Sequence, residues 1–263
     1  MKVVVLVKHV PDTAADRHFA ADLTLDRDAV AGRLDEADEY AIEQALRIAE
    51  SATCDSSTVT ALTMGPPAAG AALRRALAMG ADGGVHVLDD ALHGSDALAT
   101  ARVLAAAVRR LGFDLVVCGA ASTDSGTALV PPMLGELLGV AVISHADAVR
   151  VEEGEIVARR EDDAAVEEVA APLPAVASVT DRSGQPRYPK IRAIADARQK
   201  PLRTWSLTDL GMDPDGFGLD ASATVVRMVI PHTRRRAGGV IRDDDRGGAA
   251  VGLADFLTER HFI

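Results

Sequence analysis

Residues 114–139 read DLVVCGAASTDSGTALVPPMLGELLG, and this stretch decides how the chain folds. It opens with a short apolar run at 115–118, which is typical of a buried strand in a parallel sheet. Small residues occupy 119–127, and a helix is expected from about residue 128 to 138, with Gly139 just past its end. The stretch therefore predicts a strand that passes through a tight loop into a helix.

This loop is suited to bind a phosphate with neutral groups. Backbone N–H groups and hydroxyls can close on a phosphate at the positive end of the following helix. Residues 119–127 contain no lysine or arginine, so the loop is not a P-loop of the G-x-x-x-x-G-K-[ST] type. A nucleotide held in this way would be bound for structure or as a cofactor, and not hydrolysed. A strand-to-helix turn without a ligand is the alternative.

The composition indicates an ordinary α/β protein. Of the 263 residues 48% are apolar and 25% charged, enough for one sizeable core. The formal net charge of −11 argues against a nucleic-acid-binding protein, because phosphate backbones attract basic surfaces. Cys54 and Cys118 lie far apart without a CxxC motif, and no apolar run reaches the roughly 18 residues of a membrane span. We expect a cytoplasmic protein that is not membrane-embedded and holds no metal.

Strands and helices alternate in the first half of the chain. Apolar runs predict strands at 2–7, 59–64, 84–88 and 115–118. Helical periodicity predicts helices at 36–50, 68–79 and 95–111. Asp35 and Ser95 are placed to cap the first and third of these helices. The order indicates an α/β fold with a doubly wound, mainly parallel sheet.

After Gly139 the pattern changes. Runs at 149–151 and 155–159 flank Glu152-Glu153-Gly154, which predicts a hairpin. Two more strands are expected at 166–170 and 175–180, as an antiparallel extension of the sheet. We assign residues 1–208 to one α/β nucleotide-binding domain and 209–263 to an extended C-terminal arm that contacts a partner.

Four motifs follow one another along the chain with suitable spacing. They are MKVVVLVKHVPDT, ALRRALAMGADGGVHV, CGAASTDSGTALVPPMLGELLG and LPAVASVTDRSGQPRYPKIRAIADARQKP. Together they resemble the β subunits of electron-transfer flavoproteins, in their bacterial form. The resemblance covers residues 1–211 and continues weakly to the terminal FLTERHFI. It implies a fold of the adenine-nucleotide alpha-hydrolase-like, or Rossmann-like, kind.

The resemblance implies an electron carrier and not an enzyme with its own catalytic residues. Its partner would be an α subunit that holds most of a redox FAD, while the β pocket holds AMP or, in bifurcating members, a second FAD. Electrons would arrive from flavin dehydrogenases, such as acyl-CoA dehydrogenases, and leave for a membrane quinone oxidoreductase.

The resemblance also implies which residues bind. The cofactor-binding positions are Leu6, Val7, Thr13, Asp35, Asp38, Met64, Gly65, Gly119, Ser122, Thr123, Asp124, Ser125, Gly126, Thr127 and Ala128. The partner-docking positions are Ile191 as an apolar anchor, with Lys190, Arg192, Arg198, Lys200 and Glu161. Asp35 and Asp124 can also be helix caps, Glu161 part of a solvated charge run, and Ile191 a residue of the chain's own core.

The chain departs from the family pattern at two places near the expected nucleotide. Leu34-Asp35-Glu36-Ala37-Asp38 stands where many members have an Asn-Pro segment. Ala120-Ala121 stands where many have Arg-Gln or Lys-Gln. Both changes remove polar groups, so the identity of the ligand stays open.

Two other classes of protein share such folds. An adenine-nucleotide hydrolase or pyrophosphatase would need an SGGxDS-type loop after the first strand, where this chain has KHVPDT. A stress-type regulatory module would need neither the basic, proline-rich segment after Thr180 nor a long C-terminal arm. Both alternatives are disfavoured by these features.

Overall fold

The structure, a computed structural model, describes residues 1–51, 56–230, 239–243 and 248–263. Its contacts divide the chain into two units, Met1–Arg227 and Met228–Ile263. The second unit contains helix α6 (Gly248–Glu259).

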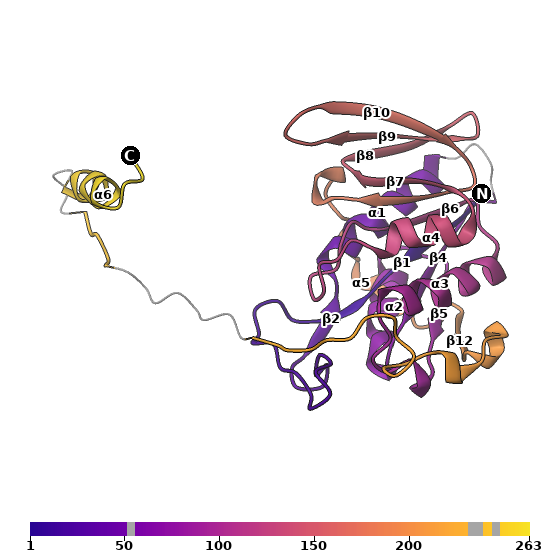
Figure 1. Cartoon of the computed structure of the whole chain (residues 1–263). Coiled ribbons are helices and arrows are strands. Elements are labelled where there is room, and N and C mark those ends of the chain that lie inside the picture. The colour runs from indigo at the N-terminus through magenta and orange to yellow at the C-terminus, as the bar shows by residue number, and fades with distance from the viewer. Residues whose placement is uncertain (52–55, 231–238, 244–247) are drawn as a thin grey trace. The chain divides into compact units, whose positions relative to one another are not determined.

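A seven-stranded parallel sheet forms the centre of the first unit, with the order β12-β5-β4-β1-β6-β11-β7 (Figure 1). Its strands are β1 (Lys2–Leu6), β4 (Thr58–Met64), β5 (Gly83–Val87), β6 (Leu115–Gly119), β7 (Ala141–Ala146), β11 (Ala175–Val179) and β12 (Leu202–Trp205). The strands at the centre consist almost entirely of buried small and β-branched residues, which suits a sheet covered on both faces.

Helices cover both faces of this sheet. They are α1 (Glu36–Ser51), α2 (Gly70–Met79, after the 3₁₀ turn η1, Pro67–Ala69), α3 (Ala97–Leu111) and α4 (Val130–Leu138). Val3 and Val5 of β1 pack with α1 and α2, whereas Val4 packs with α3 and α4. Because successive side chains of a strand point to opposite faces, the two pairs of helices lie on opposite sides. The predicted doubly wound α/β fold is confirmed.

Strand β11 corrects one expectation. Instead of extending the sheet in antiparallel fashion, it lies between β6 and β7 and runs parallel to both. All five of its residues are buried, as is usual for an internal parallel strand. The antiparallel part is a separate sheet of β8 (Ala148–Glu152), β9 (Glu155–Glu161) and β10 (Val166–Pro172). The predicted hairpin joins β8 to β9.

Two helix starts also differ from expectation. Asp96, not Ser95, caps α3, and its carboxylate accepts a hydrogen bond from the Ala99 N–H at 2.8 Å. Helix α4 begins at Val130 and not at Ala128, because Ala128 has a φ of +54° that no helix permits.

The remaining elements are short. They are the pair β2 (His9–Pro11) and β3 (Gly32–Leu34), helix α5 (Ile191–Asp196), and the 3₁₀ turns η2 (Asp90–Leu92), η3 (Asp181–Ser183), η4 (Thr208–Leu210) and η5 (Pro214–Gly216). Residues 209–227 belong to the first unit, where Phe217 is buried and the Arg102 guanidinium lies 5.0 Å from its ring. The role of the later residues as an arm on a partner stays a prediction. None of the helices that the structure describes is long and apolar enough to cross a membrane.

Candidate functional site

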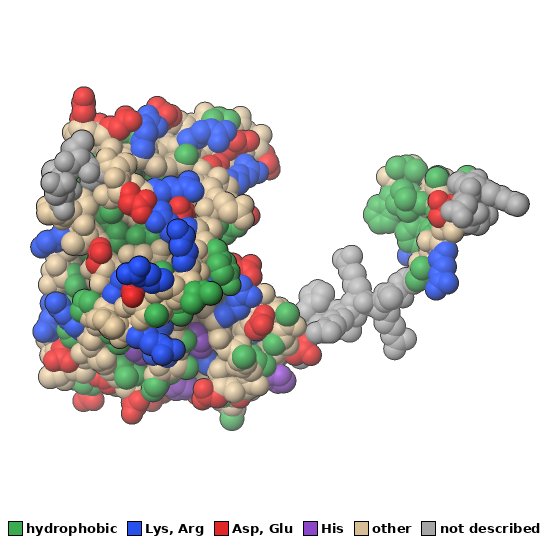
Figure 2. All heavy atoms as spheres, turned by 180° about the vertical axis from the view of Figure 1, so that it is seen from behind, with side chains coloured by type: hydrophobic (Ala, Val, Ile, Leu, Met, Phe, Trp, Pro, Cys, Tyr) green, Lys and Arg blue, Asp and Glu red, His purple; other side chains and the backbone are tan. Residues whose placement is uncertain are grey.

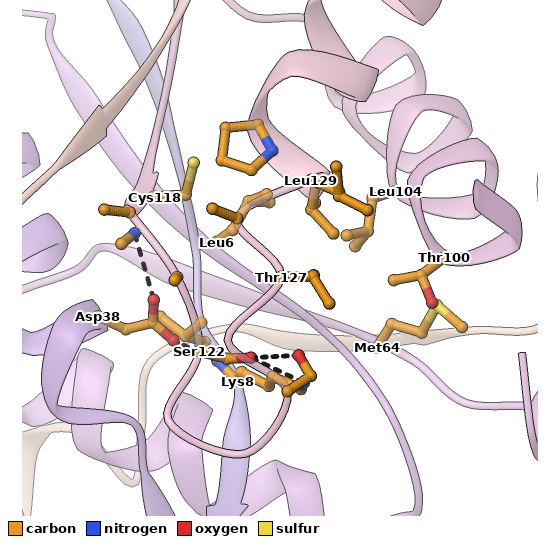
Figure 3. Close-up of a pocket in the computed structure, with 18 of the residues that line it drawn as sticks. Leu6, Lys8, Asp38, Met64, Thr100, Leu104, Cys118, Ser122, Thr127 and Leu129 are labelled. Atoms are coloured by element: carbon orange, nitrogen blue, oxygen red, sulfur yellow. Dashed lines mark hydrogen bonds between the residues drawn. The ribbon is translucent and has the colours of Figure 1, made fainter. Parts of the chain in front are cut away.

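A cavity of about 140 Å³ lies where β1, β4 and β6 end, beside the loop that joins β6 to α4. In an open parallel sheet, ligands bind outside the carboxyl ends of the strands. Figure 3 shows Asp38, Ser122 and Lys8 on one side of this cavity and Leu104 and Leu129 on another. One part of the cavity is therefore apolar and the other polar. A nucleotide needs both, because its nucleobase packs on apolar side chains and its phosphate needs polar groups.

The apolar part is built from three elements. Leu6 ends β1, Leu62 and Met64 come from β4, and Leu104 comes from α3. A planar ring of low polarity fits among such side chains. The polar part consists of Lys8 and of the hydroxyl-bearing residues Ser122, Ser125 and Thr127 of the loop.

The loop folds back on itself before α4. The Gly126 N–H donates to the Ser122 carbonyl at 2.8 Å, and the hydroxyls of Ser122 and Ser125 lie 2.8 Å apart. Gly126 has a φ of +61° and Ala128 one of +54°. Both residues are therefore in the left-handed region of the backbone map.

Asp35 ties the loop to helix α1. One carboxylate oxygen accepts from the Ala37 N–H at 3.2 Å, which makes Asp35 a helix cap. The other accepts from the N–H and hydroxyl of Thr123, at 2.7 and 3.2 Å. Asp35 is fully buried and does not line the cavity, so it holds the loop in place.

Asp124 holds the loop from the other side through two cations. Its carboxylate is 2.6 Å from the Lys8 ammonium and 2.8 Å from the Arg27 guanidinium, and its side chain is only 3% exposed. Burial alone would raise the pKa of Asp124. The charge and hydrogen bond of Lys8, with bonds from Ser122 and Arg27, outweigh burial and lower that pKa.

Asp38 lies at the floor of the cavity under Gly119. Its carboxyl oxygens accept from the N–H groups of Lys8 at 2.7 Å and Gly119 at 3.3 Å. Burial, and then the charge of Asp35, raise the pKa of Asp38 to about 8 against these bonds. A Cβ at Gly119 would come within 2.8 Å of the Asp38 carboxyl and 2.9 Å of Ala37, so only glycine fits here.

Asp38 makes stability depend on pH. Its pKa is about 8 in the folded state and near 3.8 when unfolded, so the folded chain binds the extra proton between these values. Its contribution to stability is therefore greatest at low pH and is lost as the pH rises to about 8. We expect this part of the decline to be missing in Asp38→Asn. Unfolding in denaturant between pH 5 and 8.5 measures it, and parallel pH profiles for both proteins would contradict it.

Gly126→Val should cost about 1–3 kcal/mol, because a β-branched residue is strained at positive φ. No atom lies closer than 4.0 Å to the position of its Cβ, so backbone strain is the cause. Strain in this loop should also reduce the nucleotide retained per heterodimer, measured by chromatography of an acid extract.

Gly139→Val is the matched control for this variant. Gly139 has a φ of +71° and open space around it, but it ends α4 away from the cavity. It should lower stability and leave nucleotide retention unchanged. Equal retention in Gly126→Val and wild type would contradict a role of the loop in binding.

Most expected cofactor positions surround the cavity. Those that line it are Leu6, Val7, Asp38, Met64, Gly119, Ser122, Ser125, Thr127 and Ala128. Those that shape the loop are Asp35, Thr123, Asp124 and Gly126. Gly65 follows β4, where its carbonyl lies 2.9 Å from Nε2 of His86, and it does not line the cavity. Thr13 is exposed in a turn after β2 and does not line the cavity.

Several lining residues were not among the expected ones. They are Lys8, Leu62, Thr100, Leu104, Cys118 and Pro131. The wall is completed by Ala120, Ala121, Leu129 and Val130, which belong to the stretch 119–130 that the resemblance places at the nucleotide. Thr100 and Leu104 are one turn apart on α3, a spacing visible in the sequence. The sequence alone does not indicate that this side of α3 faces the cavity.

A second candidate surface is helix α5 and the segment before it. Ile191 is 89% exposed and the nearby Tyr188 84%, so Ile191 is not part of the chain's own core. Lys190, Arg192 and Arg198 are exposed around it. Figure 2 shows a face of the molecule on which basic and acidic side chains are mixed, with apolar side chains between them. An apolar anchor within a basic rim is typical of a docking site.

Arg187 fixes this segment to helix α1. Its N–H and Nε donate to Glu43 at 3.0 and 2.8 Å, and its two Nη atoms donate to Glu50 at 2.6 and 3.0 Å. The Gln44 amide adds a 2.6 Å bond to the Ser183 carbonyl. Burial would raise the pKa of Glu43, but bonds from Arg187 and Arg47 lower it.

Two expected docking residues have other contacts. The Lys200 ammonium donates to the carbonyls of Leu77 and Ala81, at 2.9 and 2.7 Å, beyond the end of α2. It is therefore committed to a helix end, where a cation is favourable. Glu161 ends β9, 2.6 Å from Arg159 and 3.8 Å from Arg182. It pairs with its own sheet as a solvated charge.

Comparisons with known proteins agree with the geometry. Residues 22–210 match the electron transfer flavoprotein domain family. The electron transfer flavoprotein subunit beta of Mycobacterium leprae is 40% identical over 253 residues, 95% of each chain. This chain belongs to the electron transfer flavoprotein β-subunit family.

Two further relatives have different names. The caffeyl-CoA reductase–Etf complex subunit CarD of Acetobacterium woodii is 31% identical over 264 residues. The acryloyl-CoA reductase electron transfer subunit gamma of Anaerotignum propionicum is 32% identical over 272 residues. Both alignments cover 100% of each chain.

Membership of this family confirms the resemblance and sets aside the hydrolase and the stress-type module. The chain is an electron carrier subunit and not a catalytic enzyme. Membership of the family also implies that the chain associates with FAD and pairs with an α subunit.

Proposed function

We propose that this chain carries electrons in a heterodimer with an α subunit, from flavin dehydrogenases toward a membrane quinone oxidoreductase, and holds AMP in its own cavity. The observation that carries the proposal is the cavity at the carboxyl ends of β1, β4 and β6. It combines an apolar slot with hydroxyls on a loop before a helix. Such an arrangement favours the binding of a nucleotide.

The polarity of the cavity supports a mononucleotide. Its volume of about 140 Å³ is below the roughly 300–1,000 Å³ of pockets that enclose drug-sized ligands, so it has room for one part of a nucleotide, such as the base. The apolar slot suits adenine, and the loop suits one phosphate. Ala120 and Ala121 add no polar group that would hold a second nucleotide half.

FAD, when bound mostly by the α subunit, supplies the redox chemistry. The residues of this chain would bind the nucleotide and form the surface on which a dehydrogenase docks. The loop held by Asp35 and Asp124 would bind the nucleotide, and the exposed segment around Ile191 would meet the dehydrogenase. The apolar residues Met228, Ile230, Val240, Val251 and Phe262 are more than half exposed, which favours burial of this part on the α subunit.

A second FAD in the cavity is the competing candidate. It is favoured by the relatives named for caffeyl-CoA and acryloyl-CoA reductases, because these names differ from that of the mycobacterial subunit. The two candidates differ in the nucleotide content of the same heterodimer.

The experiment is to co-express the chain with its α subunit and identify the extracted ligands by mass spectrometry. One FAD and one AMP per heterodimer is the expected result. Two FAD molecules per heterodimer and no AMP would show that a second FAD occupies the cavity. One FAD without a second nucleotide would overturn the nucleotide site but not the docking role.

A further inference from the structure

A phosphate in this cavity needs a charge that its loop does not contain. The protein has a formal net charge of −11, and residues 119–127 carry no cation. Backbone dipoles and hydroxyls bind phosphate, but charge-assisted hydrogen bonds are about twice as strong as neutral ones. A cation from another part of the chain would therefore strengthen binding markedly.

Lys8 is such a cation. It follows β1 by two residues, lines the cavity, and brings its ammonium 3.2 Å from the Ser122 hydroxyl. Figure 3 shows Lys8 beside Ser122 at the polar side of the cavity. Of the described residues that line the cavity, Lys8 alone is cationic and Asp38 alone is acidic. Because the pKa of Asp38 is about 8, that acid carries little charge at neutral pH.

The ammonium also has a partner that it can leave. Asp124 is paired with Lys8 at 2.6 Å and with Arg27 at 2.8 Å. Arg27 is fixed independently, by a 3.1 Å bond to the His9 carbonyl. If Lys8 turns toward the cavity, Arg27 still neutralises the buried carboxylate of Asp124, so no buried charge is left unpaired. The Lys8 side chain is 37% exposed and has room to move.

We propose that Lys8 binds the phosphate of the adenine nucleotide in this cavity, exchanging Asp124 for the phosphate while Arg27 keeps Asp124 paired. The proposal rests on the proposed function in one respect, the presence of an adenine nucleotide. The phosphate can be that of AMP or part of the pyrophosphate of a dinucleotide.

The test measures the affinity of AMP, ADP and adenosine for the heterodimer after its bound nucleotide is removed, by titration calorimetry. Lys8→Met should weaken AMP binding about tenfold to a hundredfold, as expected for one charge-assisted bond. Adenosine, which has no phosphate, should bind within about twofold of wild type. Lys8→Arg should restore most of the affinity for AMP. Lys2→Met is the matched control, because it removes the same charge from the opposite end of β1.

Each other outcome is decisive. Unchanged binding of both AMP and ADP in Lys8→Met overturns the role of Lys8 and leaves the nucleotide site standing. An equal loss for AMP and adenosine shows that Lys8 only supports the loop, which also overturns it. A loss for ADP alone supports Lys8 and identifies the pyrophosphate of a dinucleotide. If wild type binds neither AMP nor ADP, both this proposal and the nucleotide part of the proposed function fail.

Discussion

Ile191→Ala is expected to slow electron transfer from cognate flavin dehydrogenases about tenfold or more, since burying an isoleucine side chain is worth about 1.5–3 kcal/mol. Ile191 begins α5 and is 89% exposed, so truncation removes nothing from the core. The flavin spectrum and the heterodimer should stay intact. Stopped-flow reduction by a cognate dehydrogenase, at several dehydrogenase concentrations, is the measurement.

Val166→Ala is the control for this prediction. Val166 is 60% exposed on β10, in the separate antiparallel sheet. Val166→Ala removes an exposed apolar surface similar to that removed by Ile191→Ala, and it should leave the rate of electron transfer unchanged. If Ile191→Ala transfers electrons at the wild-type rate, Ile191 is not the anchor, and Tyr188 is the next residue to replace.

Arg187→Met should weaken docking although Arg187 is not the anchor. It removes side-chain bonds that hold the segment before α5 to Glu43 and Glu50. The 4%-exposed carboxylate of Glu43 then keeps the Arg47 guanidinium and the backbone N–H of residue 187. Breaking a buried pair costs about 3–5 kcal/mol, and partial exposure of the Arg187 side chain reduces this toward the lower end. We expect residues 183–190 to exchange amide hydrogen faster, and the dehydrogenase concentration for half-maximal rate to rise about tenfold.

Arg187→Lys separates charge from geometry. A lysine keeps the charge but cannot bind two carboxylates with a planar fork, so it should recover only part of the docking. Both variants should retain the nucleotide of the cavity, because Arg187 does not line the cavity. Faster hydrogen exchange in Arg187→Met with normal docking would show that the segment needs no fixed position.

The core of the fold was predictable because its signal is local. The strands around residues 2–7 and 115–118 are continuous apolar runs, and the helices between them have clear periodicity and caps. The edge strands β7 and β12 were missed because they are largely not buried, and because β12 has only four residues. The position of β11 was wrong because an apolar run does not reveal which neighbours it pairs with, or in which direction.

The part of the candidate site that lies within one sequence motif was predictable. The part that depends on residues brought together by the fold was not. The residues of the loop lie in sequence, so their place at the cavity followed from one stretch. Lys8 comes 114 residues before Ser122, and only the parallel pairing of β1 and β6 brings the two strand ends together. Lys200 and Glu161 were expected at the docking surface because they are charged residues at positions that the resemblance assigns to docking. In the structure, each is paired with other residues of the chain.

Helix α1 has a consequence for engineering donor specificity. Asp35 and Asp38, at its start, hold the loop between β6 and α4. Glu43, Gln44, Arg47 and Glu50 hold the segment before α5. A chimaera that takes only residues 183–200 from a related subunit would place a foreign segment on an unmatched helix face. A productive exchange must transplant the outer face of residues 43–50 together with it, and leave residues 35–38 untouched.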